Sequence, residues 1–439
     1  MTAITLRDYK FSWMHVGIVL VFLFPLFANT LRHWVSSIYV MLVLVSLFSI
    51  KRFSYDLRKE EKIFLTIIIL HVVTTAVSNA LAGWTRASHT WFFSSDMRLL
   101  FAVPVYLYLR SIPGIWKYFV TAVPVAAIII GLTGVVDFVL RYVRGDVGMI
   151  LAEGIYGHIF QGNISALWSA LSYVAFEYFK DNKQMRALCL TGALFGALGA
   201  LVSVTRNAWL SLILLYTLIF FLHGGFINAL RSLGIKKAGL IGVALLSALY
   251  FLAGIEYVNA RFNRVFQEPV AYFQADRGQP IEFTSIGFRL EQWRGAIYAF
   301  MEKPLLGHGV GNTGKVHNRM VKEGKLNQLV YQVSADNGNP THTHSVYFSY
   351  LGDKGVVGLV LILLLLFYPL FVAIGKRHDS AGAWKFQVVL SAAFIIASLT
   401  EHPFVRNNWT SIFIVSSVVF FIWMTEADGE PSLKGAGDG

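Results

Sequence analysis

Apolar runs about as long as a lipid bilayer is thick recur along this sequence. One of them, "VVGLVLILLLLFYPLFVAIG" at residues 356–375, contains no charged side chain. A helix needs roughly 20 predominantly apolar residues to cross the hydrocarbon core of a membrane. Of the 439 residues, 56% are hydrophobic and only 14% are charged, which is too little polar cover for a water-soluble chain. The sequence therefore predicts an all-α polytopic membrane protein.

Twelve such runs predict twelve transmembrane helices. Their approximate bounds are 13–30, 34–50, 63–82, 96–110, 117–140, 160–179, 187–204, 207–222, 238–255, 345–374, 385–401 and 409–425. Charged residues within the runs are scarce and lie near the ends, as Asp137 and Glu177 do, and the interior offers little polar chemistry beyond His71. A transporter usually keeps polar or ionisable groups near the bilayer midplane. The pattern therefore argues against a transport function.

Lysine and arginine residues predict how the spans are oriented, because their excess in short connections marks the cytoplasmic side. The basic residues of alternate connections are Lys51, Arg52, Arg58, Lys59 and Lys62; Arg110 and Lys117; Lys180, Lys183 and Arg186; Arg231, Lys236 and Lys237; and Lys376, Arg377 and Lys385. These connections and both termini are expected to be cytoplasmic. Because the same residues make up most of the net charge of +12, no nucleic-acid partner is expected. The first run lacks a small-x-small cleavage site at "FPLFANT" and is expected to remain as a helix.

One exterior connection is much longer than the others. It divides the chain into residues 1–255 with nine spans, a loop at 256–344, residues 345–425 with three spans, and a disordered cytoplasmic tail at 426–439. Within the loop, "RLEQWRGAIYAF" has apolar residues at helical spacing, which predicts an ordered helix near the membrane surface. The single cysteine, Cys189, lies in a span, so no disulfide forms within the chain.

Arginines gather on the predicted exterior face. They include Arg206 at a tight turn between the seventh and eighth spans, and Arg261, Arg264, Arg277, Arg289 and Arg294 in the long loop. A guanidinium group binds phosphate oxygens in a bidentate manner, whereas an ammonium group acts as a point charge. The same loop contains the acidic residues Glu256, Glu268, Asp276, Glu282, Glu291, Glu302, Glu323 and Asp336, so pairing with carboxylates is the alternative. For Arg206 the alternative is a side chain that reaches from a helix end to the lipid headgroups.

Two histidines stand between the loop and the tenth span, in "THTHS". His344 directly precedes the span, and an imidazole with an ordinary pKa near 6.5 can accept a proton at neutral pH. His342 belongs either to the same site or to its surroundings, and a single interfacial hydrogen bond is the alternative for each. Two imidazoles without a third ligand do not predict a metal site. Gly355 and Gly358 share one face of the expected helix and would let another backbone approach, or they reflect ordinary packing.

These histidine and glycine positions resemble a known signature. His344, Ser345, nine residues, Gly355, two valines and Gly358 match the pattern shared by the O-antigen ligases, the O-antigen polymerases and the O-linked oligosaccharyltransferases. Upstream, "RLEQWRGAIYAFMEKPLLGHG" is similar to the family's segment of arginine, tryptophan and a Pro-Leu-x-Gly-x-Gly turn. "SVTRNAW" is similar to its Ser-Arg-Gly-Ala stretch, although Thr205 and Asn207 depart from that pattern.

The resemblance implies a GT-C-like membrane glycosyltransferase of the bacterial inner membrane, with its active site facing the periplasm. Such ligases move a glycan from undecaprenyl pyrophosphate to a sugar hydroxyl of the lipid A-core, without metal or other cofactor and with inversion at the anomeric carbon. Membrane lipids would surround both substrates. A polymerase, a protein O-oligosaccharyltransferase and a polysaccharide exporter are the alternatives.

The resemblance also implies roles for individual residues. His344 would be the catalytic base, and Arg206 and Arg289 would bind the pyrophosphate. His342, Arg264 and Arg294 are further candidates for the same site.

Overall fold

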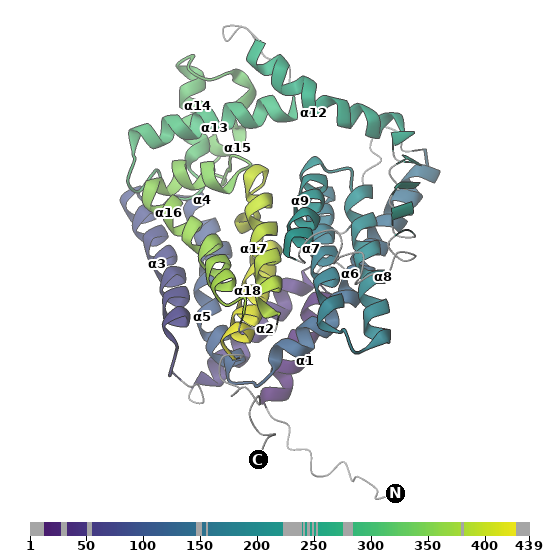
Figure 1. Ribbon diagram of the computed structural model, residues 1–439. Coiled ribbons are helices and arrows are strands. Elements are labelled where there is room, and N and C mark those ends of the chain that lie inside the picture. The colour runs from purple at the N-terminus through teal and green to yellow at the C-terminus, as the bar shows by residue number, and fades with distance from the viewer. Residues whose placement is uncertain are drawn as a thin grey trace, which may run out of the picture.

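A computed structural model describes residues 13–27, 33–50, 55–145, 152–154, 157–222, 254–274, 284–378 and 382–426, together with scattered positions between 239 and 253. These residues form helices and turns, and no strand occurs among them (Figure 1). The long helices are α1 (Trp13–Leu26), α2 (Trp34–Phe48), α3 (Lys59–Leu81), α5 (Met97–Arg110), α6 (Ile115–Val143), α7 (His158–Tyr178), α8 (Lys183–Val202), α9 (Arg206–Leu222), α12 (Glu256–Gln274), α13 (Ser285–Glu302), α14 (Thr313–Lys322), α16 (Val346–Gly375), α17 (Ala383–Thr400) and α18 (Asn407–Glu426). The short elements are α4 (Arg86–Trp91), the π-helix η3 (Phe92–Asp96), the 3-10 helices η4 (Gln328–Val330) and η5 (Pro403–Val405), and α15 (Val333–Asp336).

Seven helical segments of the described chain are long and apolar enough to cross a membrane. They are Lys59–Leu81, Arg86–Arg110, Ile115–Val143, Lys183–Val202, Val346–Gly375, Ala383–Thr400 and Asn407–Glu426. The helices α1, α2 and α9 are apolar but shorter. The prediction of an all-α, multi-pass membrane protein is confirmed at this level, whereas the count of twelve spans stays a prediction. Eight of the eighteen positions of the ninth expected span, 238–255, and the tail at 427–439 lie outside the described residues.

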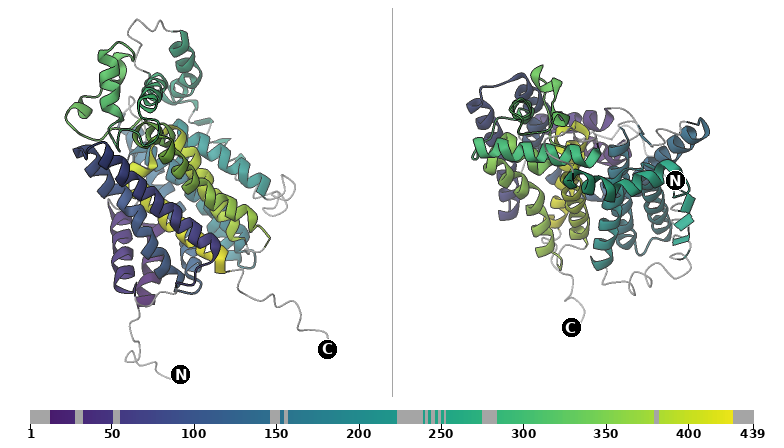
Figure 2. Two further views of the ribbon diagram at one scale, coloured as in Figure 1. Left: turned by 90° about the vertical axis from the view of Figure 1, so that its left-hand side faces the viewer. Right: turned by 90° about the horizontal axis from the view of Figure 1, so that it is seen from above.

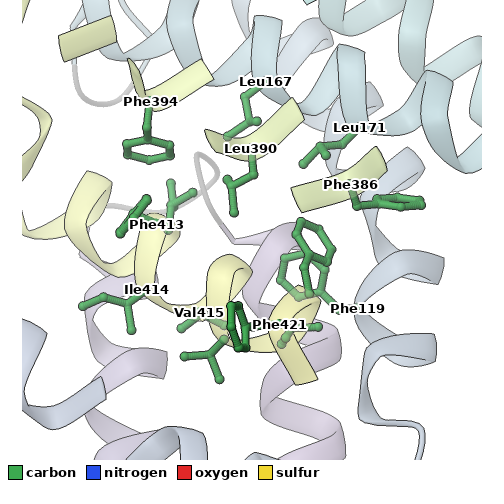
Figure 3. Packing of buried hydrophobic residues seen from close by; sticks show 14 of the residues in the cluster. Phe119, Leu167, Leu171, Phe386, Leu390, Phe394, Phe413, Ile414, Val415 and Phe421 are labelled. Carbon is green, nitrogen blue, oxygen red and sulfur yellow. The ribbon is translucent and has the colours of Figure 1, made fainter. Parts of the chain in front are cut away.

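The core of the bundle surrounds α17 and α18. Figure 3 shows Phe386 and Phe394 of α17 against Phe413 and Phe421 of α18, next to Leu167 of α7. Every described residue of α18 from its third to its nineteenth position is buried, so the other helices enclose it. In a membrane, helices gain little from leaving lipid for one another, and close van der Waals packing therefore supplies much of the stability.

The two ends of the bundle differ in character. At one end, Glu61 at the start of α3 accepts from Arg110 at the end of α5, at 2.7 Å, and Glu426 at the end of α18 accepts from the backbone of Gly114 at 3.4 Å. The basic residues Arg110 and Lys117 lie at this end. At the other end, α12, α13, α14 and α15 extend across the tops of the long helices (Figures 1 and 2). The described parts of the loop that was expected to carry the polar chemistry therefore contain several helices, which cap one end.

The helix α16 is interrupted at Gly355, which has φ 62° and ψ −162°. The interruption frees the N–H groups of Val356 and Val357, and these donate to the carbonyls of Pro304 at 2.8 Å and Leu305 at 3.3 Å. A Cβ atom on Gly355 would lie 2.4 Å from the carbonyl carbon of Leu305. The turn after α13 thus docks against the break. Another backbone does approach at Gly355, as expected, but the two glycines do not share one regular helix face, because Gly355 is non-helical and Gly358 faces the side chain of Lys354 on its own helix.

Candidate active site

The segment that precedes α16 is held from two sides. Trp293 of α13 donates its indole N–H to the carbonyl of Thr343 at 3.0 Å, and the hydroxyl of Ser345 donates to the carbonyl of Ser398 in α17 at 3.3 Å. Between these anchors, His344 has φ 51°, in the left-handed region. Such a backbone costs a residue with a side chain roughly 1 kcal/mol, and positions of this kind cluster at functional sites. The imidazole of His344 is therefore aimed by the surrounding structure.

His344 and Arg289 meet at one carboxylate. Nη2 of Arg289 donates to Oε1 of Glu401 at 3.0 Å, and Nδ1 of His344 lies 3.9 Å from Oε2 of the same residue. The second distance is too long for a hydrogen bond, but such contacts often shorten when substrate binds. The side chain of Glu401 is 8% exposed and that of His344 is 33% exposed. The carboxylate is thus enclosed, while the imidazole remains accessible.

The charge of Glu401 is stabilised by its neighbours. Burial raises the pKa of a carboxyl group, but His344 and Arg289 outweigh this effect and hold the pKa of Glu401 below its ordinary value. Glu401 is therefore ionised at neutral pH. An ionised carboxylate beside an imidazole favours the protonated ring, which is the form that a general base reaches when it has taken a proton.

Arg289 uses most of its donors within the protein. Besides Glu401, it donates from Nε to the carbonyl of Thr400 at 3.3 Å, and from Nη1 to the carbonyl and the hydroxyl of Ser285 at 3.1 and 2.5 Å. A guanidinium has five N–H donors. These four contacts leave one N–H of Arg289 for a ligand, so this side chain is fixed in place and offers little further hydrogen bonding.

Arg206 is the first residue of α9, and it is bound by a carboxylate of α12. Its two terminal nitrogens donate to the two oxygens of Glu268, at 3.1 and 2.7 Å. Burial raises the pKa of Glu268, but Arg206 and the N–H of Ile286 outweigh it, so that the pKa is lowered. The pairing leaves three N–H donors of Arg206 for a ligand. Arg206 therefore has more free hydrogen-bonding capacity than Arg289.

The turn that carries Arg206 lies close to Glu401. The side-chain amide of Asn207 donates to the carbonyl of Ala397 at 3.5 Å, and the backbone N–H of Glu401 donates to the same carbonyl at 3.0 Å. Ile286, whose N–H contacts Glu268, is the second residue of α13, three residues before Arg289. The starts of α9 and α13 and the end of α17 therefore come together around His344.

The remaining arginine candidates are placed differently. Arg294 donates to Glu291 at 3.4 Å and to the hydroxyl of Tyr298 at 3.2 Å, so its contacts are within α13. Arg264 is exposed on α12 and lowers the pKa of Glu268 through its charge. Neither contacts Glu401 in the described structure. Arg277 and the side chain of Arg261 lie outside the described residues.

His342 forms the inner side of the site, with His402. The ring of His342 accepts the backbone N–H of His344 at 3.1 Å through Nδ1 and lies 5.9 Å from the ring of His402. Burial lowers the pKa of His342 well below its ordinary value and that of His402 to about 3, so both rings are neutral at pH 7. In the neutral His342, a proton on Nε2 is consistent with Nδ1 as acceptor. We therefore regard His342 as a support for the backbone of His344.

A buried ionic cluster lies behind the histidines. Nζ of Lys354 donates to Oδ1 of Asp96 at 2.9 Å, and Nε2 of His71 lies 3.4 Å from the same oxygen. The expectation that the spans hold little beyond His71 was therefore wrong. A cavity of about 20 Å³ between Asp96, Lys354 and His402 has room for about one water molecule. The absence of interior charge can no longer be used against transport.

Sequence reasoning missed Glu401 and His402. They lie in "TEHPFVRN", residues 400–407, where the eleventh expected span ends and the connection to the twelfth begins. The alternation of basic connections already placed this short segment on the same side as the long loop. A carboxylate, an imidazole and Arg406 in so short an exterior turn were the signal that could have revealed it.

Comparison with known proteins relates the segment that contains much of this site to a protein family. Residues 191–363 match the model of a family described as O-antigen ligase. The chain carries an O-antigen ligase family domain. The ligase-family domain includes Arg206, Arg289 and His344, and the family predicted from the histidine signature is confirmed. Glu401 lies beyond the matched residues.

A more extended similarity relates the chain to one curated protein. A protein of Haemophilus influenzae described as uncharacterized is 25% identical over 337 residues, which cover 74% of this chain and 77% of the relative. The similarity therefore reaches well beyond the 173 positions of residues 191–363. Because the relative is described as uncharacterized, this similarity gives no information about activity beyond the match to the O-antigen ligase family.

Proposed function

We propose that this protein is an O-antigen ligase, a glycosyltransferase that moves a glycan from undecaprenyl pyrophosphate to a sugar hydroxyl of the lipid A-core. The observation that carries the proposal is that Glu401 contacts both Arg289 and His344, at 3.0 and 3.9 Å. A base and a fixed cation are thereby held together, as transfer from a diphosphate to a hydroxyl requires.

The acceptor hydroxyl is a poor nucleophile until its proton is removed. In the proposed reaction, His344 takes this proton while the acceptor oxygen forms a bond to the anomeric carbon. The bond from that carbon to the diphosphate oxygen breaks, and its electron pair leaves with the diphosphate. Attack opposite the leaving group inverts the anomeric centre. General base catalysis of this kind contributes typically about 10²- to 10⁴-fold to the rate.

The departing diphosphate gains negative charge, and fixed cations stabilise that charge. Arg206 has three N–H donors beyond its pair with Glu268, whereas Arg289 has one beyond its internal contacts. We therefore assign the main pyrophosphate contact to Arg206 and a positioning and electrostatic role to Arg289. Two guanidinium groups supply this charge without a metal ion.

The location of the site supports a reaction on the periplasmic side of the bacterial inner membrane. The starts of α9, α13 and α16, which carry or adjoin the candidate residues, lie at the capped end of the bundle, whereas α5 ends at Arg110 and α6, which contains Lys117, begins at the other end (Figure 1). Since basic connections mark the cytoplasm, the capped end would face the periplasm and both termini the cytoplasm. A site beside membrane-spanning helices also suits substrates whose lipid tails stay among the membrane lipids.

Deletion of the gene followed by gel analysis of lipopolysaccharide tests the proposal. Loss of the whole ladder, with long undecaprenyl-linked chains accumulating, is the result expected for a ligase. A core that carries a single repeat would instead indicate a polymerase. An unchanged ladder with lost protein glycosylation would indicate an O-oligosaccharyltransferase.

A polysaccharide exporter is the second candidate, and the buried pair of Asp96 and Lys354 is the observation that favours it. A His344→Ala variant distinguishes a transferase from an exporter. A transferase loses product formation while the lipid-linked donor still reaches the exterior face. An exporter with this substitution would continue to move glycan across the membrane.

A further inference from the structure

A second hollow lies at the capped end of the bundle, apart from the histidines. It has a volume of about 270 Å³ and is formed by the connection from α3 to α4, the turn after α13 and one side of α14. The side chains that matter for its chemistry are those of Thr85, Lys303, Asn312, Lys315 and Arg319. Three of these five are cationic, and no carboxylate lines the hollow.

The cations of the hollow are only partly neutralised. Arg319 donates to both oxygens of Glu302 at 2.5 Å. Lys303 and Lys315, by contrast, have no carboxylate partner among the described contacts. Two uncompensated ammonium groups around one hollow attract an anion, and a phosphate monoester with close to two negative charges matches them best.

The neutral groups of the hollow suit a sugar. The hydroxyl of Thr85 donates to Oδ1 of Asn312 at 2.9 Å, and the amide of Asn312 donates to the carbonyl of His308 at 3.2 Å, which leaves one amide N–H available. His308 is also part of the lining, and burial lowers its pKa. Its Nε2 lies 3.0 Å from the carbonyl of Ala299, so the other ring nitrogen can accept a hydroxyl proton. Donors and acceptors therefore stand beside the cations.

The hollow is rigidly joined to the active site. Thr341 lies three residues before His344; its N–H donates to the carbonyl of Gly311 at 3.2 Å, and its hydroxyl accepts the N–H of Gly314 at 3.1 Å. The carboxylate of Asp353 also binds the turn, through the N–H groups of Gly311 at 2.9 Å and Thr313 at 3.0 Å. One turn thus forms a wall of the hollow on one side and supports the histidine segment on the other.

We propose that this hollow binds a phosphate ester on the saccharide part of the acceptor glycolipid. The inference rests on the proposed function and adds a specificity site to it. The donor's diphosphate has its own cations at Arg206 and Arg289, where bidentate guanidinium geometry suits a fixed leaving group. Lys303 and Lys315 are flexible point charges, which suit a phosphate that is bound for recognition rather than for reaction.

The test compares two double variants of the full-length protein. Lys303→Ala with Lys315→Ala removes the two free cations, and Lys322→Ala with Lys325→Ala removes the same charge from the same loop outside the hollow. The probe is lipid A-core glycolipid, either native or stripped of its phosphates with hydrogen fluoride. Binding to purified protein in detergent is measured by equilibrium titration.

We expect the first double variant to bind native glycolipid about tenfold or more weakly than the wild type, as the loss of two charge-assisted contacts implies. Wild type, first variant and control should bind the dephosphorylated glycolipid alike. In transfer assays, KM for the native acceptor should rise while kcat stays close to the wild-type value. Equal binding of native and dephosphorylated glycolipid by the wild type would overturn the proposal.

Other sources of phosphate are distinguished by competition. Inorganic phosphate at millimolar concentration should compete weakly, and protein in phosphatidylglycerol nanodiscs should bind the glycolipid as well as protein in phosphatidylcholine nanodiscs. Displacement of the glycolipid by phosphatidylglycerol in the wild type but not in the first variant would show a headgroup site instead. If the wild type binds native glycolipid selectively but transfers nothing to it, the proposed function fails while the phosphate site stands.

Discussion

Nδ1 of His344 lies 3.9 Å from Oε2 of Glu401, across 57 positions of sequence, and the other oxygen of that carboxylate binds Arg289. The arrangement makes Glu401 a positioning residue for the proposed base. Its charge favours the protonated imidazole that proton transfer creates, and its bond to Arg289 fixes where that charge is. One side chain thereby joins the acid–base and the electrostatic parts of the proposed site.

Glu401→Gln should lower the rate of glycan transfer by roughly 10²-fold, because the amide keeps the shape but loses the charge that stabilises the imidazolium. Glu401→Asp should retain an intermediate rate. The measurement is the initial rate of transfer as a function of pH, and loss of the carboxylate should change the acidic limb of the profile, where a general base becomes protonated. A pH profile of unchanged shape in Glu401→Gln would show that this residue has only a structural role.

Variants of Arg206 and Glu268 distinguish a role of Arg206 in ligand binding from a structural role of the ion pair. Arg206→Ala should lower transfer by about 10²-fold or more, since a preorganised charge at the diphosphate is lost. Arg206→Lys should recover little because it lacks the forked geometry. Glu268→Gln should have a much smaller effect, because it removes only the anchor of the cation. Equal losses in Arg206→Ala and Glu268→Gln, measured as initial rates, would indicate that the ion pair is structural.

Gly355→Ala should destabilise the protein by about 2 kcal/mol or more. The backbone at this position is in a region that only glycine adopts readily, and a Cβ atom would lie 2.4 Å from the carbonyl carbon of Leu305. Gly375→Ala is the matched control on the same helix, because nothing lies within 4 Å of its added carbon. Thermal unfolding in detergent measures both. Similar unfolding temperatures for the two variants would contradict the packing described here.

His402 should make stability depend on pH. Burial lowers its pKa from 6.5 to about 3 in the folded protein, so the unfolded chain binds the extra proton between these values. The free energy of unfolding that depends on neutral His402 is fully present above pH 6.5. It is lost as the pH falls towards 3, by up to about 1.4 kcal/mol per pH unit. His402→Gln should flatten the fall in unfolding temperature between pH 7 and pH 5. His378 is exposed, and His378→Gln serves as the control. The same slope of unfolding temperature against pH in the wild type, His402→Gln and His378→Gln would contradict this account.

The sequence was informative wherever a property is local. Apolar run length predicted the helical membrane architecture, and the spacing from His344 to Gly358 predicted the family. Contacts between residues that are far apart in the sequence could not be predicted from local patterns. The loop contains eight acidic residues of similar character, and nothing in their spacing shows that Glu268 is the partner of Arg206.

Two features depended on tertiary structure alone. Asp96 and Lys354 are 258 positions apart, and each appears in the sequence as a charge near other polar residues rather than as half of a buried pair. The non-helical backbone at Gly355 likewise depends on the turn at Pro304 and Leu305, which supplies the carbonyls for the freed N–H groups. Without that partner, an uninterrupted helix was the simplest expectation.

The most direct measurement is glycan transfer by the purified, reconstituted protein from an undecaprenyl-pyrophosphate-linked glycan to lipid A-core, in the presence of a chelator. The account predicts transfer by the wild type and transfer slower by about 10²-fold or more in His344→Ala and in Arg206→Ala, with both variants folded as judged by their unfolding temperatures. Near-normal transfer by the two alanine variants, or no transfer by the wild type to this acceptor, would contradict it.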